Sequence, residues 1–239
     1  PYTLVVYSPP LLLNKINKRT PLGFNDLTPL ARLYTDYQIM VVKADSPLKD
    51  LKQVLDALKR DPQSLTVGGV SAPGSMDHLS FMLAAGKAGI EIKKIPYVSF
   101  QSGSELLAAL LGGQIDIVST GVGEVLGHLE AKTIRALAVT SPERYKDPRL
   151  SGIPTLKESG IDATFEVWRG IFGPPDMPEE ARVYMESALK RMIETQAWKD
   201  QVAKYNWTTA YLPGREFKFF LEKQEDLLGG LLNSLGLVQ

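Results

Sequence analysis

At 239 residues the chain exceeds a typical single domain, so we expect two modest lobes that bury a substantial core. Its 27 Lys and Arg residues balance its 27 Asp and Glu residues, and it has no basic run, which argues against nucleic-acid binding. The absence of cysteine excludes disulfides, thiolate nucleophiles and cysteine-ligated metals.

The hydropathy pattern contains no segment that would cross a bilayer. The longest apolar runs, such as residues 106–111, are far shorter than the roughly 18 residues that a transmembrane helix needs. The chain starts at Pro1 with neither an initiator Met nor a signal peptide. We therefore expect a processed or truncated chain from which any export signal is absent.

The first 140 residues indicate an α/β fold. Residues 2–7 are predicted as a strand, and an apolar stripe over residues 51–58 predicts a helix that covers a sheet. From residue 65 to residue 140, short apolar segments alternate with helical ones, which predicts a parallel sheet with right-handed crossovers. Strands are expected at 65–69, 92–97, 115–119 and 134–140, and helices at about 75–87, 102–111 and 123–131.

The composition changes at residues 142–160, which are rich in Pro, Gly and charged residues, before a strand predicted at 164–173. We interpret this change as a crossing between lobes. Lobe 1 is then expected at residues 1–44 and 161–239, and lobe 2 at residues 45–160. The remaining chain is mostly helical, with two apolar stripes that predict packing surfaces. The stripes comprise Ala181, Tyr184, Met185, Ala188, Leu189 and Met192, and then Phe217, Phe220, Leu221, Leu227, Leu228, Leu231 and Leu235.

Three loops rich in glycine and hydroxyl residues follow predicted strands of lobe 2, at residues 68–75, 97–104 and 119–123. Ligands of parallel α/β sheets bind at this edge, where helix N-termini offer unpaired N–H groups and a partial positive charge. Such loops suit a carboxylate. Ser75, Ser102 and Ser104 are also good N-cap residues, so ordinary helix capping explains any one of them.

Other chemistries have weaker support. The glycines of residues 121–127 have neither the spacing nor the following acidic residue of a dinucleotide-binding fingerprint. The chain has only two histidines, His78 and His128, and we expect neither to be catalytic, to bind metal or to hold a cofactor. His78 is expected in the first turn of a helix, facing solvent. A hydrolase using Ser71 or Ser75 stays an alternative.

Trp168 and Arg169 lie in the strand that follows the predicted crossing. Trp168 would either wall a ligand cleft or pack in a core. Arg169 would either meet a carboxylate or form a structural contact, and we favour the structural contact.

The sequence resembles the periplasmic receptors of tripartite tricarboxylate transporters, the TctC or Bug family, over nearly its whole length. The most specific part is residues 105–116, ELLAALLGGQID, after Ile95-Pro96-Tyr97. Further matching segments are residues 1–4, 24–42, 67–68, 74–75, 78–79, 134–141, 153–156 with Gly160, and 168–170 before Pro174-Pro175.

This resemblance implies a type II periplasmic binding fold, with two α/β lobes and a ligand cleft between them. It implies a periplasmic or extracytoplasmic receptor, not an enzyme, that binds a small organic carboxylate and passes it to the transporter's membrane components; we expect a monomer. By matching position, its ligand contacts are Ser8, Ser71, Gly74, Ser75, Tyr97, Ser99, Ser102, Thr120 and Gly121, with Trp168 as a further candidate.

The chain departs from the family pattern at its start, because the family has a further βα segment before residues 2–7 that supplies much of the first lobe's ligand contact. We expect lobe 1 to lack that segment in this chain. A ligand-sensing effector domain of the same fold, as in LysR-type regulators, is an alternative function, although no DNA-reading helix-turn-helix is present in the sequence.

Overall fold

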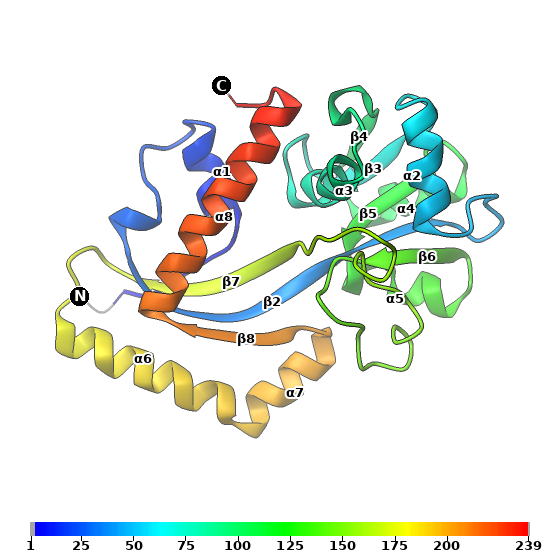
Figure 1. Ribbon diagram of the computed structural model, residues 1–239. Helices are drawn as coiled ribbons and strands as arrows, with labels where there is room; N and C mark the ends of the chain where they lie inside the picture. Colours follow the sequence, from blue (N-terminus) through cyan, green and yellow to red (C-terminus); the bar gives the residue numbers. More distant parts are fainter. Residues whose placement is uncertain (1–2, 239) are drawn as a thin grey trace. The chain divides into compact units, whose positions relative to one another are not determined.

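A computed structural model describes residues 3–238, which form two compact units (Figure 1). Unit 1 holds the described residues up to Asp36, then Val167–Asn233 and the last residues from Leu237. Unit 2 holds Tyr37–Glu166 and Ser234–Gly236. The units therefore divide after Asp36 and after Glu166. The sequence predicts the lobe boundaries after residues 44 and 160 instead. None of the described helices is long and apolar enough to cross a membrane.

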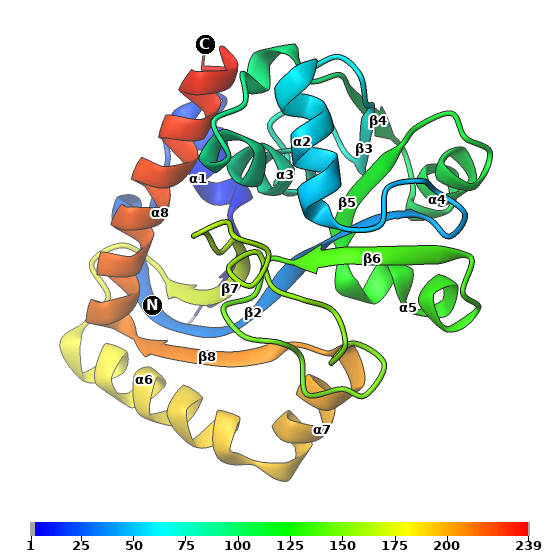
Figure 2. The same cartoon turned by 45° about the vertical axis from the view of Figure 1, so that its right-hand side comes forward.

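Unit 2 contains a five-stranded sheet in the order β6-β2-β5-β3-β4. Strands β3, β4 and β5 are parallel, as predicted, but β2 is antiparallel to both β5 and β6. The strands are β2 (Thr28–Lys43), β3 (Val67–Val70), β4 (Tyr97–Phe100), β5 (Ile117–Gly121) and β6 (Ile134–Val139). The second half of β2 thus lies beside β6 (Figure 2), so the sheet is mixed and not wholly parallel as predicted. Local periodicity carries no information on which strand inserts between two others.

The predicted helices of unit 2 are confirmed to within one or two residues at each end. They are α2 (Leu51–Arg60), α3 (Met76–Lys87), α4 (Gly103–Leu111) and α5 (Val122–Glu130). Asp50 caps α2 by accepting a hydrogen bond from Gln53 N–H at 2.8 Å, and the predicted apolar stripe of α2 is buried. Helices α4 and α5 pack with Ile39, Val41 and Val118 in one apolar core.

The strand predicted at residues 92–97 is wrong. Ile92–Lys94 form a 3₁₀ turn, and β4 begins only at Tyr97. Ile92 and Ile95 are both buried, and a spacing of three residues places side chains above one another in a 3₁₀ turn. Tyr97 therefore opens a strand instead of ending one, opposite Val67 of β3.

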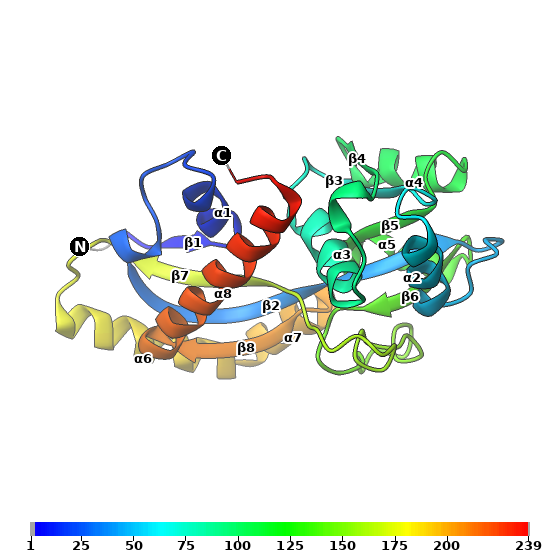
Figure 3. The same ribbon diagram turned by 45° about the horizontal axis from the view of Figure 1, so that its top comes forward.

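Unit 1 is built on β7 (Glu166–Gly173), the first half of β2 and β8 (Thr208–Pro213). β1 (Val5–Tyr7) is antiparallel to β7, and β8 is antiparallel to β2. Figure 3 shows α8 lying across these strands. The helices of this unit are α1 (Pro10–Ile16), α6 (Glu179–Glu194), α7 (Gln196–Tyr205) and α8 (Gly214–Leu235), with a 3₁₀ turn at Phe24–Asp26.

The two predicted apolar stripes of unit 1 differ in burial. On α8, Phe217, Leu221 and Leu228 are buried, which confirms a packing surface. Helix α6 has no fully buried residue, and Tyr184 of its predicted stripe is 64% exposed. The periodicity of α6 correctly predicted a helix but overstated its burial.

Candidate functional site

The loop between β3 and α3, residues 71–75, has an unusual backbone. Ser71 has φ 86° and Gly74 has φ 88°. Glycine adopts a left-handed conformation at little cost, but serine does so only when its surroundings hold it there. The loop therefore needs side chains that fix it.

Three side chains provide these contacts, and we call Asp77, His78 and Tyr97 the loop clamp. Asp77 Oδ2 accepts a hydrogen bond from Val70 N–H at 2.7 Å, and His78 Nδ1 accepts one from Gly74 N–H at 2.9 Å. Tyr97 donates its hydroxyl proton to the Ser71 carbonyl at 3.3 Å, and its ring lies 4.3 Å from the His78 ring. The clamp thus binds backbone groups on both sides of the loop.

Gly69 allows the clamp to approach the strand closely. A Cβ atom at this position would lie 2.4 Å from the Tyr97 hydroxyl and 2.6 Å from Asp77 Cβ. Neither distance is compatible with ordinary packing. A glycine is therefore required where β3 meets the clamp.

Burial sets the protonation of the clamp. Burial raises the pKa of Asp77 to about 7. The hydrogen bond from Val70 N–H lowers this pKa, and the charge of Glu124 raises it. Burial lowers the pKa of His78 to about 4, so the imidazole is neutral at pH 7. A neutral ring whose Nδ1 accepts from Gly74 N–H carries its proton on Nε2. The expectation that His78 faces solvent is wrong, because its side chain is buried against the loop that it holds.

Helix α3 begins without a side-chain cap. Ser75 is its N-cap residue but accepts no capping hydrogen bond, and the Ser75 hydroxyl lies 3.5 Å from the Tyr97 hydroxyl. The first helical backbone bond is from Leu79 N–H to the Ser75 carbonyl. Gly74 N–H and Ser75 N–H already donate to His78 Nδ1 and to the Ala72 carbonyl. Among the described residues, the N–H groups of residues 76–78 have no such partner and are available to an anion, together with the positive end of the helix dipole.

Helix α4 begins differently. Ser102 caps it by accepting from Glu105 N–H at 3.3 Å, and Glu105 Oε2 accepts from Gln101 N–H at 3.1 Å. Glu124 Oε2 lies 2.7 Å from the place of a Cβ atom on Gly103. The N-terminus of α4 therefore already has two carboxylates beside it, and Ser102 has the capping role that was the alternative interpretation.

The end of β5 contributes a buried hydroxyl. Thr120 is fully buried, and its Oγ1 has no hydrogen-bond partner among the described residues. Ser119 bonds Ser80 of α3 at 2.8 Å, so Ser119 faces α3 and Thr120 faces the opposite side of the sheet. Gly121 follows as the N-cap residue of α5, also without a side-chain cap.

The predicted contact residues fall into separate groups. Ser71, Gly74, Ser75 and Tyr97 come together at the β3–α3 loop. Ser99 is exposed on β4. Ser8 belongs to unit 1, where its carbonyl accepts from Leu11 N–H at 2.9 Å at the start of α1.

Trp168 also belongs to unit 1, where it is fully buried. It packs edge to face against Phe217 and Phe220, with ring centroids 5.6 Å and 6.4 Å away. Arg169 Nη1 donates to the carbonyls of Val167 and Trp168 at 3.0 and 3.1 Å. Both residues thus have structural contacts in this unit.

Asp77 and His78 are functional candidates that the sequence analysis did not place in the site. The signal was present, since both follow Ser75 within one helical turn. Asp77 Oδ2 and His78 Nδ1 each accept a hydrogen bond from a backbone N–H group. His78 Nδ1 is therefore not paired with a serine hydroxyl, as a hydrolase using Ser71 or Ser75 would require. The described residues contain no group of three His, Cys, Asp or Glu side chains that would hold a metal ion.

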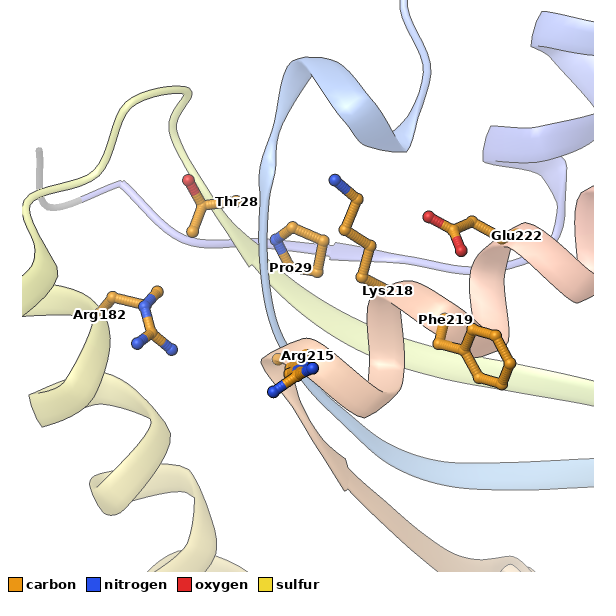
Figure 4. Close-up of a pocket in the computed structure, with 8 residues that line it drawn as sticks. Thr28, Pro29, Arg182, Arg215, Lys218, Phe219 and Glu222 are labelled. Carbon is orange, nitrogen blue, oxygen red and sulfur yellow. The ribbon is translucent and has the colours of Figure 1, made fainter.

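Two surface grooves lie away from this loop. One, of about 540 Å³, is in unit 1 around Arg182, Arg215, Lys218 and Glu222 (Figure 4). Arg182 is paired with both Glu179 and Glu186, which leaves Arg215, Lys218 and Glu222 as the other charged residues that line the groove. The second, of about 510 Å³, is in unit 2 and includes Glu124 and His128. Neither groove is lined by any of the predicted contact residues.

Comparison with known proteins identifies a family model that covers nearly the whole chain and a curated relative that covers part of it. The family model described as "Tripartite tricarboxylate transporter family receptor" matches residues 2–237. The UPF0065 protein in the tcbD-tcbE intergenic region of Pseudomonas sp. (strain P51) is 30% identical over 170 residues. The match covers 70% of this chain and 49% of that relative, so the chain spans about half the length of this curated relative.

Solved structures are similar over nearly the whole chain. A TctC solute-binding protein from Polaromonas has 27% identity and a TM-score of 0.84, covering 98% of this chain and 78% of that one. The R. palustris protein Rpa4515, solved with adipate, has 22% identity and a TM-score of 0.78, with coverages of 98% and 78%. These likenesses confirm the fold class predicted from the sequence.

Proposed function

Because the chain belongs to the tripartite tricarboxylate transporter receptor family, we propose that it is an extracytoplasmic receptor that captures a small organic carboxylate. In this proposal the receptor then delivers the acid to the membrane components of a transporter of that kind. The supporting observation within the chain is the uncapped N-terminus of α3 behind the clamped β3–α3 loop.

The loop suits a carboxylate for three physical reasons. The free N–H groups of the first turn of α3 donate to an anion without bringing a fixed countercharge. Gly74 adopts the left-handed backbone conformation that this loop requires, and the hydroxyls of Ser71 and Ser75 add donors in the same loop. The clamp fixes the donors before the ligand arrives, so little conformational entropy is lost on binding.

The other predicted ligand contacts stay predictions, and the structure supports them to different degrees. Thr120 and Gly121 offer a buried hydroxyl and a second uncapped helix start. Ser99, Ser102, Ser8 and Trp168 have less support, since Ser99 is exposed and Ser102 and Trp168 already have structural contacts. We therefore place the carboxylate at Ser71, Gly74 and Ser75.

Isothermal titration calorimetry tests the proposal. The receptor produced from its complete gene is titrated with succinate, adipate, malate and citrate, and with succinamide as a neutral control. We expect at least one acid to bind and succinamide not to bind, because the N-terminus of α3 attracts negative charge. A folded receptor that binds none of the four acids would contradict the proposal.

A further inference from the structure

Asp77 is a buried carboxylate without a cationic partner. Its side chain is 9% exposed, and no ion pair with it is found among residues 3–238. Within the described part of the chain, the one hydrogen bond of its carboxylate is the 2.7 Å contact from Val70 N–H. A charged carboxylate in such a place is costly unless it is paired, so the protonated form is favoured.

None of the described side chains that face Asp77 carries a positive charge. Tyr97 of β4 stays a neutral phenol, since burial raises its pKa to about 12, and His78 on the same helix is neutral at pH 7. Glu124 of α5 is the charged group that acts on Asp77, and it is itself negative. From β3 the contact is the Val70 amide. The carboxyl therefore responds strongly to any further negative charge.

We propose that Asp77 is a positioning residue that couples carboxylate capture at the β3–α3 loop to uptake of a proton. Asp77 holds the loop through Val70 N–H, and it lies in the first turn of α3, whose N-terminus receives the anion. The arriving charge repels the Asp77 carboxylate and favours its protonated form. The protonated carboxyl keeps an oxygen that accepts from Val70 N–H, so the loop stays in place. This inference rests on the proposed function.

The direction of the coupling follows from linkage. The free receptor has a pKa of about 7 at Asp77, and bound anion raises that pKa further. Between the two values the complex holds more protons than the free receptor, so affinity falls as pH rises. Below about pH 6 both forms are protonated, and affinity becomes independent of Asp77.

Calorimetry in buffers of different ionisation enthalpy counts the protons that binding takes up. The probe is succinate or adipate, whichever binds more tightly, because both are largely ionised above about pH 6.5. We expect the wild type to take up protons, with Kd increasing by up to about tenfold per pH unit above pH 7.

Two variants separate the charge of Asp77 from its position. Asp77→Asn keeps an oxygen for Val70 N–H but cannot titrate, so it should bind the same acid with no proton uptake. Glu105→Gln is the matched control, because Glu105 is an exposed carboxylate that also accepts a backbone N–H, and it should behave as the wild type does. Proton uptake that persists in Asp77→Asn overturns the proposal.

The wild type alone also decides the question if Asp77→Asn does not fold. A wild-type receptor that binds the acid without proton uptake overturns the coupling and leaves the proposed function intact. A folded receptor that binds no acid overturns the proposed function, and the coupling with it.

Discussion

The β3–α3 and β4–α4 loops look alike in sequence but present their helix N-termini in opposite ways. Both combine glycine with serine after a parallel strand. At α4, Ser102 accepts from Glu105 N–H, Glu105 accepts from Gln101 N–H just before the helix, and Glu124 adds negative charge. At α3 the hydroxyl of the N-cap Ser75 accepts no hydrogen bond from a backbone N–H, and the clamp holds the loop.

A serine-rich loop of this protein is therefore a candidate anion site only where the serine side chain does not cap the helix that follows. The distinction is partly readable in sequence. Ser102-x-x-Glu105 has the capping-box pattern, whereas Ser75 is followed at the same spacing by His78. His78 at that position instead accepts a hydrogen bond at Nδ1 from the Gly74 N–H.

The largest expected effect comes from adding one methyl group at Gly69 of β3, beside the clamp. Gly69→Ala forces a Cβ atom against the Tyr97 hydroxyl and Asp77 Cβ, so we expect a loss of about 1–3 kcal/mol in unfolding free energy. Carboxylate affinity should fall at least about tenfold as the clamp shifts. Urea unfolding and calorimetry measure the two losses.

Gly103→Ala is the matched control for Gly69→Ala. Its Cβ atom would meet the end of the Glu124 side chain, which can rotate away. We expect a change below about 0.5 kcal/mol and unchanged affinity. Equal losses in the two alanine variants would contradict the distinction between the loops.

Two serine variants are expected to have smaller effects, and each should affect a different property of the protein. Ser102→Ala removes a cap and should lower the unfolding free energy by about 1 kcal/mol with little change in affinity. Ser75→Ala removes no cap, so it should leave stability within about 0.5 kcal/mol but weaken carboxylate binding. If Ser102→Ala were the variant that lost affinity, the site would belong to the β4–α4 loop.

The smallest effect near neutral pH concerns His78. Its folded pKa of about 4 lies below the usual value of 6.5, so the unfolded chain binds the proton more readily. Stability contributed by neutral His78 is present above about pH 6.5 and is lost as pH falls toward 4. In NMR titration of the wild type, the His78 ring should change shift with a midpoint near 4. A midpoint near 6.5 would mean that the ring is not buried against the loop.

Much of unit 2 could be predicted because its signals are local. The apolar stripe of α2 and the starts and ends of α3, α4 and α5 follow from helical periodicity and capping residues. The sequence predicts a strand where Ile92–Lys94 form a 3₁₀ turn, because the buried Ile92 and Ile95 also fit a short apolar run. The insertion of β2 beside β6 was not predicted, since hydrogen bonding between residues about 90 positions apart leaves no local pattern.

The α/β class, the family and the three hydroxyl-rich loops can be read from the sequence, because these depend on residue order within short segments. Which loop precedes an uncapped helix N-terminus can be read only from the tertiary structure. The difference depends on contacts made across the fold, where Tyr97 of β4 reaches the Ser71 carbonyl and Glu124 of α5 reaches α4. Burial, which no single residue type specifies, then gives Asp77 and His78 their altered proton affinities.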